Sequence, residues 1–358
     1  MQMQKNKLNF KGQNIYVGID VHKKDWKVSI RSESLTYKIF SQPPQVRALV
    51  SHLRENFPGA TYYSAYEAGY SGFRTHRELI KEGVNNIVVH AADVPTTQKE
   101  HAFKTDKRDC RKIARSLLNK ELVGLHVPSL KTQEDRSLVR LRATFRKDLT
   151  RQKNRVKQML NFYGKEIPEQ FSSSSHWSSA FIRWLKEVKF ETDSAEQAFK
   201  LLISQVEHLR SGVLEVNRRI RKLATDPAYC SNMKLMYKIP GVGLLTGMAF
   251  LTQIEDINRF PNPNCFAGYL GLVPNCHSSG DKESTGEMTY RGNKWLRTLL
   301  FESAWTAARI DPALHLAYLK HCKRMKSNNA IVRIARKLLN RIYYVLKYER
   351  EYTKGIVQ

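Results

Sequence analysis

Four carboxylates in the first third of the chain have the types and spacing of a metal-binding site. Asp20 and Glu67 each end a strand-like apolar run. Asp106 and Asp109 stand three residues apart in KTDKRDCRKIARSLL, so a helix would carry them on one face. Gathered carboxylates repel each other unless a cation lies between them, and oxygen ligands favour Mg²⁺ or Mn²⁺. The pattern indicates two-metal phosphodiester cleavage, with one ion at the attacking oxygen and one at the leaving oxygen.

The segments around these carboxylates alternate between strand and helix patterns. A lone aspartate beside a hairpin is more often a solvated turn residue, so the functional interpretation of Asp20 depends on the other three carboxylates. Three consecutive strands followed by alternating helices and strands fit an RNase H-like sheet, and they also fit other α/β folds. The predicted strands are 15–20, 26–31, 35–40, 61–66 and 86–90, and the predicted helices are 44–56, 73–82 and 106–122.

Three stretches that contain the carboxylates, GIDVHKKDW, YEAGYSGF and FKTDKRDCRKIARSLL, resemble the acidic motifs of the DEDD insertion-sequence transposases. The resemblance implies a RuvC-like, RNase H-type domain over residues 14–128, with Asp20, Glu67, Asp106 and Asp109 as its metal ligands. It also implies an RNA-guided serine recombinase related to Piv-type DNA invertases. In such a protein a structured RNA from the element pairs with donor and target DNA, and sequence choice resides in base pairing.

The C-terminal part, residues 236–350, resembles the transposase domain of the same family. The shared motifs include Ser278-Ser279-Gly280 and Gly292-Asn293. A serine beside a glycine is usually a turn former, and the role of Ser279, rather than Ser278, as the nucleophile is what the resemblance implies. Its attack would give a phosphoserine-linked DNA end. The basic residues that could surround Ser279 are Lys282, Arg291, Lys294 and Arg297.

The stretch MYKIPGVGLLTGMAFL has the pattern of a helix-hairpin-helix turn. Gly241 and Gly243 would let backbone N–H groups approach a phosphate at the N-terminus of a helix. A plain turn between two helices has the same pattern. We expect a mainly helical C-terminal domain that opens with this turn.

Residues 133–225 have the apolar spacing of long helices. A first seam, between residues 138 and 163, fits the core of a helix bundle as well as a coiled coil. A second seam follows steps of three and four residues without interruption, which predicts a homo-oligomer, a dimer or a tetramer, held by a coiled coil. The second seam is Phe199, Leu202, Val206, Leu209, Val213, Val216, Ile220 and Leu223.

The charge of the chain indicates a polyanionic partner. Its 358 residues include 60 Lys and Arg against 33 Asp and Glu, a net charge of +27. Residues 131–165 contain 11 basic and 3 acidic residues, so we expect a basic helix face toward DNA or RNA. Without a signal core or a run of about 18 apolar residues, a membrane partner is disfavoured. We expect a cytoplasmic, nucleoid-associated prokaryotic protein.

Two other functions stay open. A RuvC-like, structure-selective DNA endonuclease would use the same four carboxylates with water as the nucleophile and would need no serine. A DNA-binding protein without catalysis would need only the positive charge. The serine motif argues against the first, and the four carboxylates argue against the second.

Overall fold

The computed structural model describes residues 9–98, 105–171, 177–279, 282–289 and 291–355. The chain divides into two compact units, Met1–Val127 and Pro128–Gln358. The first unit is built on a mixed sheet and the second is mainly helical, so the chain combines an α/β part with a helical part. The division of the second unit into a middle region and a C-terminal domain remains a prediction.

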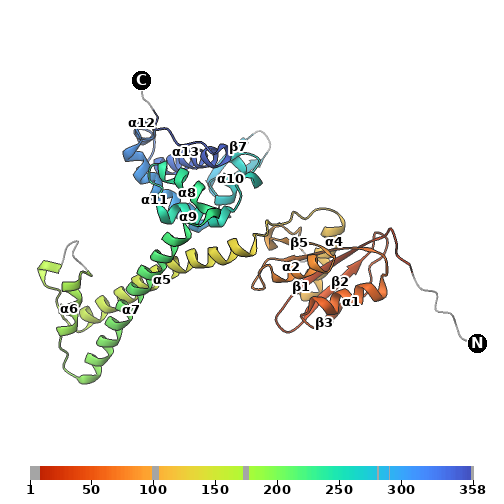
Figure 1. The fold of residues 1–358 in the computed structure, drawn as a ribbon, viewed down its shortest axis with the longest axis horizontal. Coiled ribbons are helices and arrows are strands. Elements are labelled where there is room, and N and C mark those ends of the chain that lie inside the picture. Colours follow the sequence, from red (N-terminus) through yellow and green to blue (C-terminus); the bar gives the residue numbers. More distant parts are fainter. Residues whose placement is uncertain (1–8, 99–104, 172–176, 280–281, 290, 356–358) are drawn as a thin grey trace, which may run out of the picture. The chain divides into compact units, whose positions relative to one another are not determined.

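The first unit contains a five-stranded sheet with the order β3-β2-β1-β4-β5 (Figure 1). Strand β2 pairs antiparallel with β1 and β3, whereas β4 pairs parallel with β1 and β5. The central strand, β1, therefore joins the antiparallel half of the sheet to the parallel half. The elements are β1 (Asn14–Val21), β2 (Trp26–Arg31), β3 (Phe40–Gln42), α1 (Val46–Asn56), β4 (Thr61–Glu67), α2 (Arg74–Lys81), β5 (Asn85–Val89) and α4 (Asp106–Leu118).

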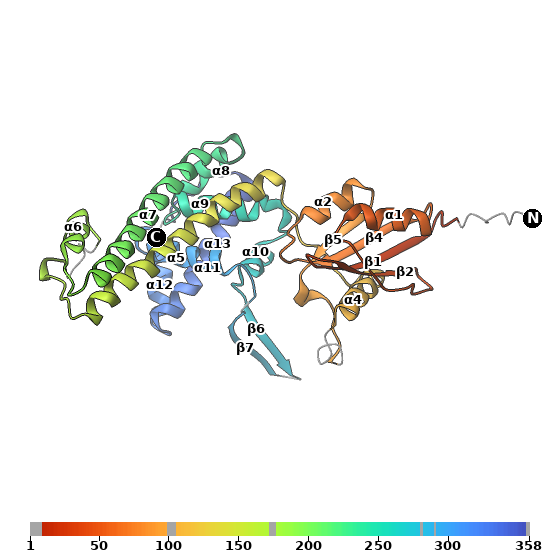
Figure 2. The ribbon, with the colours of Figure 1, turned by 90° about the horizontal axis from the view of Figure 1, so that it is seen from below.

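The residues of β1 alternate between two covered faces of the sheet. Ile15, Val17 and Ile19 are fully buried in a core that they share with α1. Gly18 faces α4, and Asp20, two residues further on, lies on the same face. Figure 2 shows α1 and α2 on one face of the sheet and α4 on the other. Strand β1 thus brings one carboxylate to the helix that carries two more.

The third predicted strand was wrong in position. Strand β3 covers Phe40–Gln42 instead of residues 35–40. The chain first makes a turn, in which the backbone N–H of Ser32 donates to the carbonyl of Leu35 at 2.9 Å and the N–H of Leu35 donates to Ser32 Oγ at 3.1 Å. After this turn Thr36 pairs with Arg31 of β2 in an isolated antiparallel bridge, in which the N–H of Tyr37 donates to the carbonyl of Ile30 at 2.9 Å. The pairing does not extend into a strand, and Leu35 is 60% exposed.

Two long helices of the second unit, α5 (Leu130–Phe162) and α7 (Asp193–Leu223), pack side by side (Figure 1). The C-terminal half of α5 meets the N-terminal half of α7, so the two helices run antiparallel. The short helix α6 (Ser179–Glu187) covers the same end. The fully or almost fully buried residues of this core include Leu149, Val156, Leu160, Phe181, Leu185, Phe199, Ile203 and Val206.

The regular seam of α7 faces α5 of the same chain. Val206 and Val213 are buried between the two helices, and Val216 and Ile220 enter the core of the C-terminal helices. Packing within one chain accounts for the buried part of the seam, and the self-association remains a prediction. The first seam was also misplaced in part, because Leu141 of α5 is 40% exposed.

The remaining helices of the second unit surround one large apolar core. A two-stranded antiparallel hairpin interrupts them between α10 and α11. Among the residues that the structure describes, no helix is long and apolar enough to cross a membrane. The elements are α8 (Pro227–Lys238), α9 (Leu244–Ile254), α10 (Pro263–Leu270), β6 (Pro274–Ser279), β7 (Lys282–Met288), α11 (Lys294–Ile310), α12 (Pro312–Cys322) and α13 (Ser327–Tyr348).

Candidate active site

The helix α4 lies directly against strand β1 because residue 18 has no side chain. A Cβ atom at Gly18 would lie 2.1 Å from the carbonyl oxygen of Cys110 and 2.5 Å from the backbone nitrogen of Ala114. Any larger residue would push the helix away from the strand. The close contact sets the N-terminal turn of α4, with Asp106 and Asp109, beside the end of β1.

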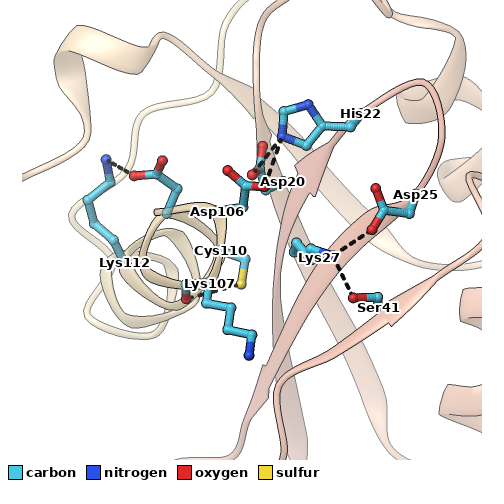
Figure 3. Close-up of polar contacts among 10 residues, drawn as sticks. Asp20, His22, Asp25, Lys27, Ser41, Asp106, Lys107, Cys110 and Lys112 are labelled. Carbon is cyan, nitrogen blue, oxygen red and sulfur yellow. Dashed lines mark hydrogen bonds and ion pairs between the residues drawn. The ribbon is translucent and has the colours of Figure 1, made fainter. Parts of the chain in front are cut away.

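The first pair of carboxylates, Asp20 and Asp106, meets at His22. The His22 Nε2 atom lies 3.1 Å from Asp20 Oδ2 and 4.0 Å from Asp106 Oδ2 (Figure 3). One ligand atom from each of the three residues lies within 4.8 Å of the other two. The side chains of Asp20, His22 and Asp106 are 22%, 48% and 58% exposed, so solvent and a ligand can reach them.

The second pair, Glu67 and Asp109, meets at a lysine. Lys112 Nζ lies 3.3 Å from Asp109 Oδ1 and 3.6 Å from Glu67 Oε1. Glu67 ends strand β4, and Lys112 follows Asp109 by one turn of α4. The structure thus arranges the four predicted carboxylates as two pairs, one around an imidazole and one around an ammonium group.

The two pairs are close enough to interact electrostatically. Burial raises the pKa of Asp20, hydrogen bonding and attraction from His22 oppose the rise, and the charges of Asp106 and Asp109 add to it. Asp106 and Asp109 occupy the first turn of α4, where the unpaired backbone N–H groups favour negative charge. The helix terminus therefore stabilises carboxylates that their mutual repulsion would otherwise disfavour.

The donor set around Asp20 and Asp106 suits a small divalent cation. Two carboxylates and one imidazole come together with open access from solvent. Carboxylate oxygens are the ligands that Mg²⁺ and Mn²⁺ prefer, and His22 can orient the Asp20 carboxylate by donating to it. The residues present therefore fit the expected metal.

Sequence reasoning missed His22 and Lys112. His22 stands two residues after Asp20 in GIDVH, and in an extended chain that spacing puts both side chains on one side. Lys112 stands three residues after Asp109, the spacing of neighbours on a helix. Both signals were present, but lysines are common in this basic chain and nothing in the pattern distinguishes a buried one.

The serine motif lies at the end of a β-hairpin. The register pairs Ser278 with Glu283 and Ser279 with Lys282, the last pair before the turn. The side chains of Ser278, Ser279 and Lys282, and the whole of Gly280, lie outside what the structure describes. The nucleophilic role of Ser279 and the phosphate contact of Lys282 remain predictions.

The other predicted phosphate contacts surround the base of this hairpin. Arg291 and Lys294 are exposed, and Lys294 is the first residue of α11. Arg297 Nη1 donates to the carbonyl oxygens of Gly271, at 2.9 Å, and Thr289, at 3.0 Å. Arg297 therefore ties α11 to the chain on both sides of the hairpin, a structural task that the sequence pattern did not show.

The two glycines of the α8–α9 turn have different surroundings. Gly241 has a φ of +80°, and a Cβ there would lie 2.2 Å from the carbonyl oxygen of Ser303. Packing against α11 is sufficient to explain this glycine. Gly243 is exposed, directly precedes α9, and has open space where a Cβ would stand. Of the two, Gly243 is the one that leaves a helix N-terminus accessible.

Comparison with known proteins gives matches along most of the chain. Residues 17–165 match the DEDD transposase family of IS110 elements, and residues 233–319 match the transposase IS116/IS110/IS902 family. A putative transposase of Sinorhizobium fredii, y4qE, is 27% identical over 297 residues, which cover 81% of this chain and 71% of the relative. The transposase for insertion sequence element IS1533 of Leptospira borgpetersenii is 25% identical over 257 residues, 70% of this chain and 72% of the relative. The transposase for element IS1111A of Coxiella burnetii is 24% identical over 258 residues, which cover 70% of this chain and 69% of the relative.

Proposed function

Because the chain belongs to the DEDD transposases of insertion sequences and is a DNA transposase, we propose that it cuts and rejoins DNA by metal-assisted attack of Ser279. Asp20, Glu67, Asp106 and Asp109 would form the metal centre. The observation that carries this proposal is the meeting of these carboxylates in two pairs at the contact between β1 and α4. A fold alone has no need to gather four negative charges in this way.

The chemistry divides between the two units. The carboxylates of the first unit would hold Mg²⁺ or Mn²⁺ at the scissile phosphate, where a bound ion polarises the phosphate and stabilises charge on the leaving oxygen. The hydroxyl oxygen of Ser279 would bond to phosphorus as the bond to the leaving strand breaks, and the serine proton would pass through solvent to the leaving oxygen. The phosphoserine bond would keep the cut end attached until another strand takes it.

The basic surfaces would bind the phosphate backbone of the nucleic acid. Helix α5 combines an excess of Lys and Arg with a position on the surface of its unit, which suits contact with a phosphate backbone. Arg291 and Lys294 would contact phosphates near the serine hairpin, and the exposed helix N-terminus at Gly243 would contact a phosphate elsewhere on the second unit. We propose that an RNA from the element supplies sequence choice by pairing with donor and target DNA, and that the protein acts on DNA at the nucleoid.

The finer description of the fold is part of the proposal. The strand order supports a RuvC-like, RNase H-type domain in the first unit. The antiparallel pair of α5 and α7 is proposed as an intramolecular coiled coil, and the α8–α9 turn as a helix-hairpin-helix-like element. An oligomer would need a surface other than the α7 seam.

Trapping of a covalent protein–DNA adduct tests the proposed reaction. Denaturing electrophoresis after incubation with labelled donor DNA, the guide RNA and Mg²⁺ should show the adduct for the wild type. It should be lost for Ser279→Ala and retained for Ser278→Ala, with DNA binding unchanged in a gel-shift assay. Loss of the adduct with Ser278→Ala alone would move the nucleophile by one residue. Cleavage at the wild-type rate by both variants would favour the endonuclease that uses water.

A further inference from the structure

The lysine at the second carboxylate pair is buried. Lys112 is 8% exposed, and its Nζ lies within 3.6 Å of carboxylate oxygens of both Glu67 and Asp109. A buried ammonium group is costly unless negative charge surrounds it, and here two carboxylates provide that charge. Its partners belong to the four carboxylates proposed to bind metal. A cation of the protein itself thus lies between two of the four.

The first pair is arranged around the imidazole of His22 instead of an ammonium group, and all three side chains are more exposed than that of Lys112. The ammonium group of Lys27 acts on Asp20 and Asp106 only at longer range, because it is bound to Asp25 and Ser41. That of Lys112, by contrast, contacts both Glu67 and Asp109 and offsets one of their two charges. The two halves of the centre differ in charge and in access, and both differences favour a divalent ion at the first pair.

A second divalent ion would meet Lys112 at short range. Any ion that used Glu67 and Asp109 together would lie within a few ångströms of an ammonium group that already contacts both. The lysine has little freedom to leave, because it is packed on α4 and its charge would lose both partners. The ammonium group and a second ion therefore compete for the position between Glu67 and Asp109.

We propose that the ammonium group of Lys112 takes the place of the second metal, so that the centre holds one divalent ion per chain, at Asp20 and Asp106. Lys112 is then a positioning residue that fixes Glu67 and Asp109 and sets the number of ions. This differs from the two-ion site expected from the sequence. The inference rests on the proposed function for the identity of the metal centre.

Counting bound Mn²⁺ on the full chain tests this assignment without any measurement of activity. Equilibrium dialysis, with free Mn²⁺ followed by electron paramagnetic resonance, should give one ion per chain for the wild type. Lys112→Met should bind a second ion, because Glu67 and Asp109 lose their cation. Lys112→Arg, which keeps the charge, should bind one. Lys107→Met is the matched control, since Lys107 is exposed on the same helix and points away from the carboxylates (Figure 3), and it should also bind one.

Two results would overturn the assignment. Two ions in the wild type would show that Lys112 does not occupy the second metal-binding position. This result does not depend on the folding of any variant. A folded Lys112→Met protein that still binds one ion would show that something other than the lysine sets the number. If the wild type bound no ion at all, the metal centre of the proposed function would fail as well, so the two failures are distinguishable.

Discussion

The carboxylates of the two units are held in opposite ways. Asp311, between α11 and α12, is fully buried and is surrounded by donors of its own unit. The backbone N–H of Leu314 donates to it at 2.8 Å, Arg341 lies at 3.3 Å, and the hydroxyl of Tyr352 donates to its other oxygen. Asp20, by contrast, is partly exposed and shares its surroundings with other carboxylates.

This difference separates a carboxylate that serves the fold from one that serves a ligand. The environment of Asp311 favours the charged form, because its partners outweigh the effect of burial and lower its pKa. The environment of Asp20 opposes the charged form and raises its pKa. The surroundings of Asp20 add no stability to the fold. Mutations in the metal centre are therefore expected to change activity without lowering the stability of the protein.

The largest expected effect is on catalysis, from Asp20→Asn. The change keeps the size of the side chain and removes a metal ligand. Strand cleavage should fall by about a thousand-fold or more, since a bound ion supplies several kcal/mol to the transition state. The free energy of unfolding should be unchanged or slightly higher, because repulsion among the carboxylates is relieved. Cleavage rates and chemical denaturation check the two parts, and a strongly destabilised variant would remove the contrast with Asp311.

The matching change in the second unit is Asp311→Asn, which should act on stability. It removes the charge that balances the partly buried Arg341, so the free energy of unfolding of that unit should fall by about 3–5 kcal/mol. Tyr352→Phe removes the hydrogen bond that the hydroxyl donates to Asp311 and the one that it accepts from Arg341, so it should cost less, about 1.5–3 kcal/mol. Equal costs for the two variants would mean that Asp311 is not the centre of this network.

The stability of the wild type and that of Asp311→Asn should depend differently on pH. The pKa of Asp311 is lower in the folded chain than its ordinary value of about 3.9. Its contribution to stability is therefore present above that value and is lost as the pH falls through the folded pKa. The stability difference between wild type and Asp311→Asn should shrink below about pH 4. Denaturation curves between neutral and acidic pH measure it, and a difference that grew on acidification would have the wrong sign.

A smaller, combined effect is expected from Gly18→Ala. The added Cβ would overlap the backbone of Cys110 and Ala114, which should cost about 1–3 kcal/mol and shift α4 away from β1. Cleavage should fall by about a hundred-fold, because a shift of about 1 Å moves Asp106 and Asp109 relative to Asp20. Gly69→Ala is a control for stability, since the nearest atom to its Cβ would lie 3.9 Å away. Full activity in Gly18→Ala would show that the contact between strand and helix does not position the site.

The sequence was a good guide where the signal was local. Alternating apolar residues predicted β1 and β2 nearly to their ends, and the spacing of Asp106 and Asp109 placed both on one face at the start of α4. The strand predicted from Leu35 is reduced to a tight turn at Ser32–Leu35 and a single bridge between Thr36 and Arg31, and β3 begins only at Phe40.

Signals that depend on a distant partner could not be interpreted from the sequence. The seam of α7 looks the same whether its partner is another chain or α5 of its own chain, and only the tertiary structure distinguishes them. Arg297 and Gly241 fit a phosphate-binding pattern, yet one binds backbone carbonyls and the other allows close packing against α11. The burial of Lys112 depends on the contact of α4 with the sheet, at β1, β2 and β4, which its own sequence neighbours do not specify.

Iron-mediated cleavage of the polypeptide tests most directly whether the four carboxylates form one metal centre. With hydrogen peroxide and ascorbate added, Fe²⁺ bound in place of Mg²⁺ reduces the peroxide to hydroxyl radicals, which cut the backbone nearest the ion. The account predicts fragments that end near residues 20, 67 and 106–109, and their loss on addition of Mg²⁺ or in Asp20→Asn. Bound iron that cut the chain only within the second unit would contradict it.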